Sequence, residues 1–528
     1  MARILVADPV DNAGVQRLKA AGHQVDVKHG LKPHELEAII GDYEALAVRS
    51  ETKVTAAVLA KARKMQVVGR AGVGVDNIDL EAATQHGVAV VNAPTGNTVA
   101  AAEHALAMMM ALSRYIPQAD ASMRRGEWNR RAFMGVEMRN KTLGVIGLGK
   151  VGSEVARRAK AFPMRILAYD PYVPQDFARS MGVETVDMDT LLAQSDYITI
   201  HTPLTAATKH LIGAEQFEKL KPGVRIVNAA RGGLVDETLL DAALKSGKVA
   251  GAALDVFSQE PPPQNMPLLA NPKCILTPHL GASTEEAQVE VAVEVAEQML
   301  AILNGQPARY TVNVPFVPAD VREALAPYLP VATKMAHLAI QLAEGQLEGI
   351  TLKVSGDLAR YNTASLAAAA LVGILAGTSE ERVNLVNAPV LARERGINVV
   401  EQKDPSADPQ YSNLVGIEVK TNEGSVYIAG TTVGGKTHLL RLNDFYLDME
   451  PSAPYMLFTS HIDRPGMIGR VGTIAGEHDV NISFMEVGRE APRGRATMIV
   501  GLDDAPSAEM LAKIRGIDGV VSVKVVTP

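Results

Sequence analysis

The chain has 528 residues, 47% hydrophobic and 21% charged, a composition typical of a globular protein with about three to four domains. Its net charge of −7 argues against nucleic-acid binding, and its single cysteine, Cys274, excludes a disulfide framework and suits a reducing cytoplasm. Asp8 comes too early for a signal peptide and the apolar stretch 365–377 is too short to cross a bilayer, so we expect a cytoplasmic protein without membrane contact.

The first hundred residues alternate helical patterns with short runs of valine, isoleucine and leucine. These runs predict five strands, at 3–8, 23–29, 45–50, 66–72 and 88–94. Such apolar runs between helices indicate a parallel sheet covered on both faces. The following segment, 97–115, predicts one long apolar helix, which suits either a core helix or a subunit contact.

From Lys141 a second alternation begins, with six predicted strands, at 141–149, 165–171, 197–203, 224–231, 249–256 and 274–279. The first strand ends in Gly147-x-Gly149-x-x-Gly152 and leads into a helix, which is the context of a dinucleotide-binding turn. A carboxylate at the end of the next strand, Asp170, would accept hydrogen bonds from ribose hydroxyls and repel a 2′-phosphate. The pattern therefore favours NAD over NADP.

Three polar residues follow later strands of this second sheet: Arg231, Glu260 and His279. Ligands of open α/β sheets bind at the carboxyl ends of strands. A guanidinium can hold a substrate carboxylate, a histidine can take a hydroxyl proton, and a carboxylate can orient the imidazole. Each residue alone could be an ordinary loop residue, but together they predict a 2-hydroxy acid dehydrogenase. No metal site is expected.

The remaining chain begins with a long helix over 283–305, followed by a linker marked by Pro315 and Pro318. Residues 317–452 form a mixed stretch with an alanine-rich helix at 365–377, a polar loop at 401–413 and a β-rich end. From Tyr455 the order β-α-β-β-α-β predicts a ferredoxin-like module.

Several motifs in order carry a resemblance to a known family: GRAGVGVDNID (69–79), GLGKVG (147–152), NAARGGLVDE (228–237), GAALDVFSQEPP (251–262) and TPHLGAST (277–284). The chain resembles the D-isomer-specific 2-hydroxy acid dehydrogenase family, in its long form with an intervening domain and a C-terminal ACT domain. The resemblance implies an α/β fold with a Rossmann-type nucleotide-binding domain (98–280) inserted in a flavodoxin-like substrate domain (1–97 and 281–310). An α+β intervening domain (317–452) and a ferredoxin-like ACT domain (453–528) would follow.

The resemblance also implies residue roles. Arg231 would orient the substrate, His279 would be the acid/base and Glu260 its partner. NAD contacts would come from the glycine turn and from Val73, Lys150, Val151, Asp170, Thr202, Ala229, Ala230, Arg231, Asp255, His279, Gly281 and Ala282. Substrate contacts would come from Arg49, Arg70, Asn97 and the backbone at Gly72 and Gly74, whose bare amides can approach a carboxylate.

In the ACT module, HIDRPG and a later asparagine match effector positions for L-serine, so His461, Asp463 and Asn481 are candidate effector residues, in a site between two chains. A purely structural ACT module is the alternative. In the intervening domain Asp448 and Glu450 stand where an anion site would need basic residues, although Lys436, His438 and Arg441 are nearby.

The implied function is oxidation of 3-phosphoglycerate to 3-phosphohydroxypyruvate with NAD, the entry to serine synthesis, in a homo-oligomer that is a dimer or a tetramer. Two alternatives stay open. One is another D-2-hydroxy acid dehydrogenase, acting on 2-hydroxyglutarate, hydroxypyruvate or glyoxylate. The other is a non-catalytic NAD-sensing protein like the corepressors built on this fold.

Overall fold

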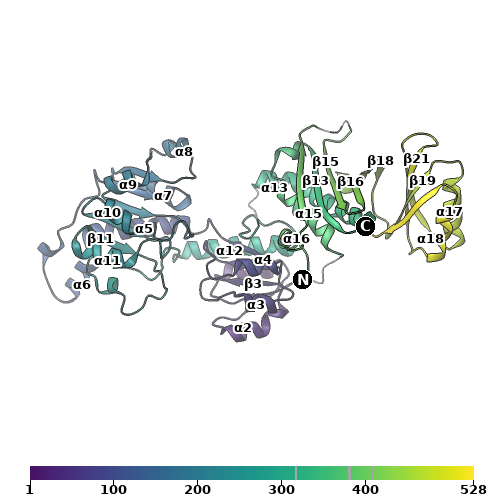
Figure 1. The fold of residues 1–528 in the computed structure, drawn as a ribbon. Helices are drawn as coiled ribbons and strands as arrows, with labels where there is room; N and C mark the ends of the chain where they lie inside the picture. Colours follow the sequence, from purple (N-terminus) through teal and green to yellow (C-terminus); the bar gives the residue numbers. More distant parts are fainter. Residues whose placement is uncertain (315–317, 378–381, 407, 409) are drawn as a thin grey trace.

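The computed structural model describes residues 1–314, 318–377, 382–406, 408 and 410–528. It contains four β-sheets, and each is the centre of one lobe (Figure 1). The linker residue Pro315 and the expected domain start at 317 lie outside the described residues. Among the residues that are described, no helix is long and apolar enough to cross a membrane.

The first sheet is parallel, in the order β2-β1-β3-β4-β5, which is the flavodoxin-like order. Its strands are β1 Arg3–Val6, β2 Gln24–Val27, β3 Ala45–Val48, β4 Val67–Arg70 and β5 Ala89–Asn92. Its helices are α1 Asn12–Ala20, α2 Pro33–Ile39, η1 Ile40–Asp42, α3 Ala56–Lys61, α4 Leu80–Gln85 and, returning from much later in the chain, α12 Glu285–Leu303. Helix α12 packs on α1, β4 and β5, so the second sheet is inserted into the first lobe.

The second sheet is also parallel, in the order β12-β11-β10-β9-β6-β7-β8, the doubly wound nucleotide-binding order. Its strands are β6 Thr142–Ile146, β7 Arg165–Tyr169, β8 Glu184–Thr185, β9 Tyr197–Ile200, β10 Val224–Asn228, β11 Val249–Leu254 and β12 Cys274–Leu276. The expected six strands were one too few, because the edge strand β8 has only two residues. The helices are α5 Thr98–Arg114, α6 Ile116–Arg124, η2 Arg130–Phe133, α7 Lys150–Ala159, α8 Gln175–Ser180, α9 Met188–Gln194, α10 Ala214–Lys219, α11 Glu237–Ser246 and η3 Pro267–Ala270.

Helix α5 is a core helix on one side, where Ala102, Ala105 and Met109 are fully buried. Its other side and the following arm carry exposed apolar side chains, among them Met110 and Trp128.

The third sheet is mixed, in the order β14-β13-β15-β16-β17-β18. Its strands are β13 Leu347–Gly356, β14 Asn398–Asp404, β15 Asn413–Thr421, β16 Gly424–Val433, β17 Lys436–Leu442 and β18 Phe445–Met449. Its helices are α13 Ala319–Leu325, η4 Ala326–Tyr328, α14 Leu329–Leu342, η5 Asp357–Arg360, α15 Ala364–Leu375 and α16 Ala388–Glu394. The expected polar loop at 401–413 was wrong for its first four residues, which belong to the exposed edge strand β14, and for Asn413, the first residue of β15. Residues 407 and 409 of this loop lie outside the described residues.

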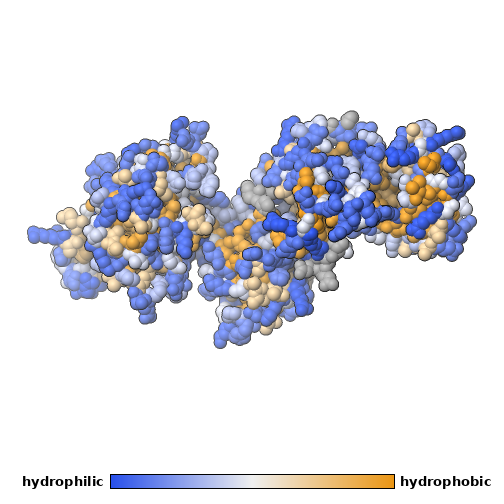
Figure 2. Space-filling view, viewed as in Figure 1, coloured by the Kyte–Doolittle hydropathy of each residue, from blue (hydrophilic) through white to orange (hydrophobic). Residues whose placement is uncertain are grey.

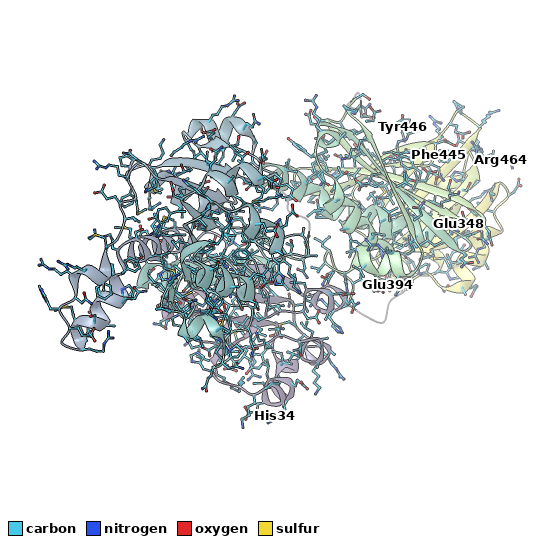
Figure 3. The ribbon with its side chains drawn as sticks, turned by 60° about the vertical axis from the view of Figure 1, so that its left-hand side comes forward. His34, Glu348, Glu394, Phe445, Tyr446 and Arg464 are labelled. Carbon is cyan, nitrogen blue, oxygen red and sulfur yellow. The ribbon has the colours of Figure 1, made fainter. Side chains whose placement is uncertain are left out.

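The fourth sheet has the order β20-β21-β19-β22, so the predicted ferredoxin-like module and the fold class are confirmed. Its elements are β19 Tyr455–Ile462, α17 Met467–Glu477, β20 Ile482–Arg489, β21 Arg495–Leu502, α18 Ala508–Arg515 and β22 Val520–Val526. Strand β20 packs beside β18, where Gly488 lies so near Phe445 and Tyr446 that a side chain would be crowded. Figure 3 shows these two residues at the edge of the third sheet, next to the module that carries Arg464.

Candidate active site

A cavity of about 490 Å³ lies where the carboxyl ends of the first two sheets face each other. Its size falls in the range of small-molecule and cofactor sites, about 300–1,000 Å³. Its wall contains most of the residues expected to bind substrate and cofactor: Arg49, Arg70, Gly72, Val73, Gly74, Asn97, Lys150, Val151, Thr202, Ala229, Ala230, Arg231, Glu260, His279, Gly281 and Ala282. Gly147, Gly149, Gly152, Asp170 and Asp255 are not in this wall.

His279 and Glu260 form a pair at the cavity wall. Nδ1 of His279 lies 2.7 Å from Oε2 of Glu260. The other carboxylate oxygen, Oε1, accepts a hydrogen bond from the Phe257 amide at 3.1 Å. Burial alone would raise the pKa of Glu260, but the bonds from His279 and Phe257 hold it below its ordinary value. An ionised Glu260 fixes the tautomer with the proton on Nδ1, which leaves Nε2 as the nitrogen for a substrate.

The backbone at His279 is held in the left-handed region, with φ +57°. Such a conformation is costly for a residue with a side chain, and it persists only where neighbours fix it. The His279 amide donates to the Asp255 carbonyl at 2.9 Å. The buried Asp255 carboxylate accepts from the Leu280 amide at 2.7 Å, the Gly281 amide at 2.8 Å and the Thr277 hydroxyl at 2.6 Å. Asp255 therefore positions the turn that presents His279.

Arg231 follows β10 and lies across the cleft on the backbone of the first lobe. Its Nε is 3.4 Å from Oδ2 of Asp76. A side chain at Gly74 would collide with the Arg231 guanidinium. Gly74 thus makes room for an arginine that comes from the other sheet, and this role could not be read from the glycine alone.

Arg49 directly follows β3, Arg70 is the last residue of β4, and both line the same cavity as Arg231. Burial and the charges of Arg231 and Arg49 lower the pKa of Arg70 to about 10. Its Nε is buried and has no hydrogen-bond partner among the described residues. Three converging cations, one with an unsatisfied donor, form a site for an anion.

The expected nest of bare amides at Gly72 to Gly74 is only partly present. The Gly72 amide already donates to the Arg70 carbonyl at 2.9 Å. At Gly72, where φ is +149°, a side chain would collide with the Arg70 guanidinium. The glycines here make space for arginines, and the guanidiniums supply the positive charge.

The glycine turn has the geometry that a dinucleotide needs. Gly147 has φ +90° and lies against the His201 carbonyl, while a side chain at Gly152 would collide with the Gly147 carbonyl. A Cβ added at Gly149, the residue directly before α7, would meet no atom within 4 Å. The first and third glycines therefore close the turn, and the second leaves open space at a helix N-terminus, which suits a pyrophosphate.

Two polar atoms of the cavity wall also fit a bound ligand. The Thr202 hydroxyl and the Asn97 side-chain oxygen are buried without a hydrogen-bond partner among the described residues. Such atoms are costly unless a ligand or water satisfies them. Oδ2 of Asp170 accepts from the Leu148 amide at 2.8 Å, which ties the strand-end carboxylate to the glycine turn.

Two residues of the site were missed in the sequence. Asp76 pairs with Arg231, and the buried Asp8 accepts hydrogen bonds from the Arg49 amide and from Thr52. Asp8 lies two residues after the end of β1, so its place near a strand end was the available signal. Asp76 gave none, because its partner comes from the other lobe.

Three family models match the chain: the NAD binding domain of D-isomer specific 2-hydroxyacid dehydrogenases over 106–281, the D-3-phosphoglycerate dehydrogenase intervening domain over 324–443 and the ACT domain over 455–519. A D-3-phosphoglycerate dehydrogenase of Synechocystis sp. is 47% identical, over 98% of this chain and 94% of that protein. That of Methanocaldococcus jannaschii is 44% identical over 100% of both chains. The chain belongs to the D-3-phosphoglycerate dehydrogenase family.

The expected resemblance and the expected NAD-binding domain are therefore confirmed. A solved structure of a glyoxylate reductase from Paecilomyes thermophila has 33% sequence identity and a TM-score of 0.53, and it covers 59% of this chain and 98% of its own. A glyoxylate reductase thus shares a large part of this framework, so the framework alone does not define the substrate of a D-3-phosphoglycerate dehydrogenase.

The three expected effector residues of the ACT module do not meet within one chain. At one end of strand β21, Ala496 is paired with His461 on one side and with Arg489 on the other. At the other end of β21, Leu502 is paired with Ile482. Asn481 precedes Ile482, so it lies about 23 Å along the sheet from the His461 end, at roughly 3.3 Å per residue. His461 is buried beside the Thr459 hydroxyl, and Asp463 accepts from the Arg493 amide at 3.2 Å.

The basic residues of the intervening domain are already engaged. Nζ of Lys436 is 2.9 Å from Oε2 of Glu450, and Nδ1 of His438 is 3.0 Å from Oδ1 of Asp448. The Arg441 guanidinium stacks on two tyrosine rings. Each of these three basic side chains therefore already has a partner within the chain.

Proposed function

We propose that this chain oxidises 3-phospho-D-glycerate to 3-phosphohydroxypyruvate with NAD, the first step of L-serine biosynthesis. Relatives of that name that match along the whole chain support the proposal. The observation that carries it is the convergence of Arg49, Arg70 and Arg231 on one cavity beside the His279–Glu260 pair. A simple 2-hydroxy acid has one carboxylate and needs one guanidinium, whereas a phosphate adds about −1.5 to −2 charges at pH 7.

In this proposal the substrate carboxylate pairs with Arg231, which also polarises the adjacent carbonyl group that forms as the hydroxyl carbon is oxidised. Nε2 of His279 accepts the hydroxyl proton, and Glu260 stabilises the imidazolium that forms. Arg49 and Arg70 hold the phosphate end, with Asn97 and the backbone at Gly72 and Gly74 around the substrate. NAD, when bound, supplies the hydride acceptor.

The cofactor would lie along the second lobe. We propose that its pyrophosphate is held at the glycine turn (Gly147, Gly149 and Gly152) and its ribose by Asp170. The other proposed contacts with the cofactor are Val73, Lys150, Val151, Thr202, Ala229, Ala230, Arg231, His279, Gly281 and Ala282. Asp255 would act through the turn that it positions, because its carboxylate is buried among protein donors.

A substrate panel tests this function. NADH formation is followed at saturating NAD with 3-phosphoglycerate, D-glycerate and D-2-hydroxyglutarate. The proposal predicts a clear preference for 3-phosphoglycerate. A preference for an unphosphorylated acid would favour the alternative of another D-2-hydroxy acid dehydrogenase, and NADH binding without turnover of any acid would favour a corepressor-like NAD sensor.

We further propose that L-serine binds between ACT modules of two chains. An antiparallel pair of modules would bring Asn481 of one chain near His461 and Asp463 of the other. Exposed apolar side chains on the module, Ile468 and Val521, support such pairing, and hydrophobic side chains are visible on this lobe in Figure 2. The enzyme would then be a dimer or a tetramer. It would work in the cytoplasm, as the single cysteine suggests.

A further inference from the structure

A second cavity, of about 580 Å³, lies between the first and third lobes. One side is the segment 307–314, which leaves the first lobe, and the other is built from α13, α15, α16 and β14. Figure 1 shows α16 directly beside α4, at the contact of these two lobes. Much of the wall is hydrocarbon, from side chains such as Leu325, Leu329, Leu371, Val390 and Ile397.

Specific contacts hold the two lobes together around this cavity. The Asn384 side chain donates to the Gly87 carbonyl at 2.7 Å. A Cβ at Gly87, whose φ is +67°, would come within 2.7 Å of that same Asn384 amide. Val386 packs onto the core of the first lobe. The cavity therefore lies in an interface between the first and third lobes that specific contacts hold together.

The charge of the cavity wall is unbalanced. Three arginines line it, Arg309, Arg322 and Arg393, against one carboxylate, Glu401. Glu401 is hydrogen-bonded to the Thr363 hydroxyl. Within the described part of the chain, none of the three guanidiniums forms an ion pair with an acid. Figure 3 shows Glu394, the neighbour of Arg393, on the side of the third lobe that faces the first.

We propose that this cavity binds a small carboxylate with a hydrocarbon body. The hydrocarbon walls would take the apolar part, and the arginines would take the carboxylate. The cavity is separate from the active-site cleft and from the ACT module. It also lies away from the β17–β18 edge, where the basic residues are paired.

A ligand in this cavity would affect the cofactor site through the aromatic ring of Tyr310. The Arg309 guanidinium lies 5.0 Å from the Tyr310 ring centre, and Nζ of Lys150 lies 5.2 Å from the same centre. An anion that draws Arg309 away would leave the ring to Lys150 and remove one positive charge near the cofactor. Both changes weaken NADH binding; this part rests on the proposed cofactor role of Lys150.

Calorimetric titration of the full-length protein tests the site, with octanoate, hexanoate and 3-phenylpropanoate as probes and octan-1-ol as the neutral match. We expect saturable binding of at least one carboxylate, weakened about tenfold or more by Arg322→Gln or Arg393→Gln. Arg360→Gln, which changes an exposed arginine of the same lobe, should leave it unchanged. Circular dichroism checks that each variant folds, and two variants are used so that one misfolded protein does not end the test. No saturable binding, unchanged binding in both variants, or equal binding of octan-1-ol would overturn the site.

The coupling is measured separately, as the Kd of NADH from fluorescence, with and without the saturating carboxylate. We expect the Kd to rise about twofold or more, and Tyr310→Leu to abolish the rise while the carboxylate still binds. An unchanged Kd in the wild type would overturn the coupling. Neither measurement uses turnover, so failure here is distinct from failure of the proposed 3-phosphoglycerate oxidation.

Discussion

Nδ1 of His279 lies 2.7 Å from the Glu260 carboxylate, although the two residues come from the ends of different strands. This pair leaves Nε2 free to act as a base, so we expect His279→Ala to lower kcat by about 10²- to 10⁴-fold. Glu260→Gln keeps a side chain of the same shape and should cost less. Both variants should still bind NADH by fluorescence titration, because His279 is only one of many proposed cofactor contacts. If His279→Ala abolished NADH binding, the lost turnover would come from the missing cofactor and would not support His279 as the proton acceptor.

Gly149 and Gly152 of the dinucleotide turn should respond differently to alanine. A Cβ at Gly149 meets nothing within 4 Å, so Gly149→Ala should fold normally but bind NADH about tenfold or more weakly, because the methyl group occupies the space for the pyrophosphate. Gly152→Ala collides with the Gly147 carbonyl and should lower the melting temperature. Gly472→Ala, in open space on α17, is the matched control. Normal NADH affinity in Gly149→Ala would rule out a pyrophosphate at this turn.

Asp255 makes stability depend on pH. Burial would raise the pKa of its carboxyl, but hydrogen bonds from His104, Thr277 and Leu280 outweigh it and hold the pKa below its ordinary value. A lowered folded-state pKa means that the carboxylate stabilises the fold fully above its unfolded value of about 3.9, and that this stability is lost as pH falls through the folded-state pKa.

We therefore expect Asp255→Asn to cost about 1–3 kcal/mol in the free energy of unfolding at neutral pH. The difference from the wild type should shrink as the pH falls below the unfolded pKa. Urea unfolding of both proteins across this range measures it. A difference that stays constant with pH would mean that the carboxylate charge contributes nothing.

Much of the active site could be predicted from the sequence, because parallel sheets place their strand ends at one edge. Arg70 is the last residue of a buried strand, Arg231 and His279 each lie three residues after one, and all three line one cavity. Contacts between lobes could not be predicted. The sequence holds no signal that Gly74 makes room for Arg231, since the two are far apart in the chain and on different sheets.

The third lobe was poorly predicted for a related reason. Strand β14 pairs with β13 alone, at the edge of the sheet, and six of its seven residues are exposed, so Asn398–Asp404 shows no buried face to mark it as a strand. The two-residue strand β8 is too short to form any pattern. In both cases a neighbouring strand defines the element, and the local sequence does not.

The distance between the two ends of the ACT sheet gives a test of serine control. If the site needs Asp463 from one chain and Asn481 from the other, Asp463→Ala and Asn481→Ala should each abolish inhibition by serine. Mixed oligomers of the two variants contain some interfaces with one intact site and should regain part of the response. Inhibition that is absent from the mixture as well would argue that both residues act within one chain.

The selectivity for the phosphorylated acid tests the central claim most directly. The ratio of kcat/KM for 3-phosphoglycerate to that for D-glycerate is measured in the wild type and in Arg70→Gln. Because Arg70 is proposed to contact only the phosphate end, we expect this ratio to fall by about tenfold or more in the variant, mainly because the phosphorylated acid binds with a higher KM. A ratio near one in the wild type, or a ratio that Arg70→Gln leaves unchanged, would contradict the account.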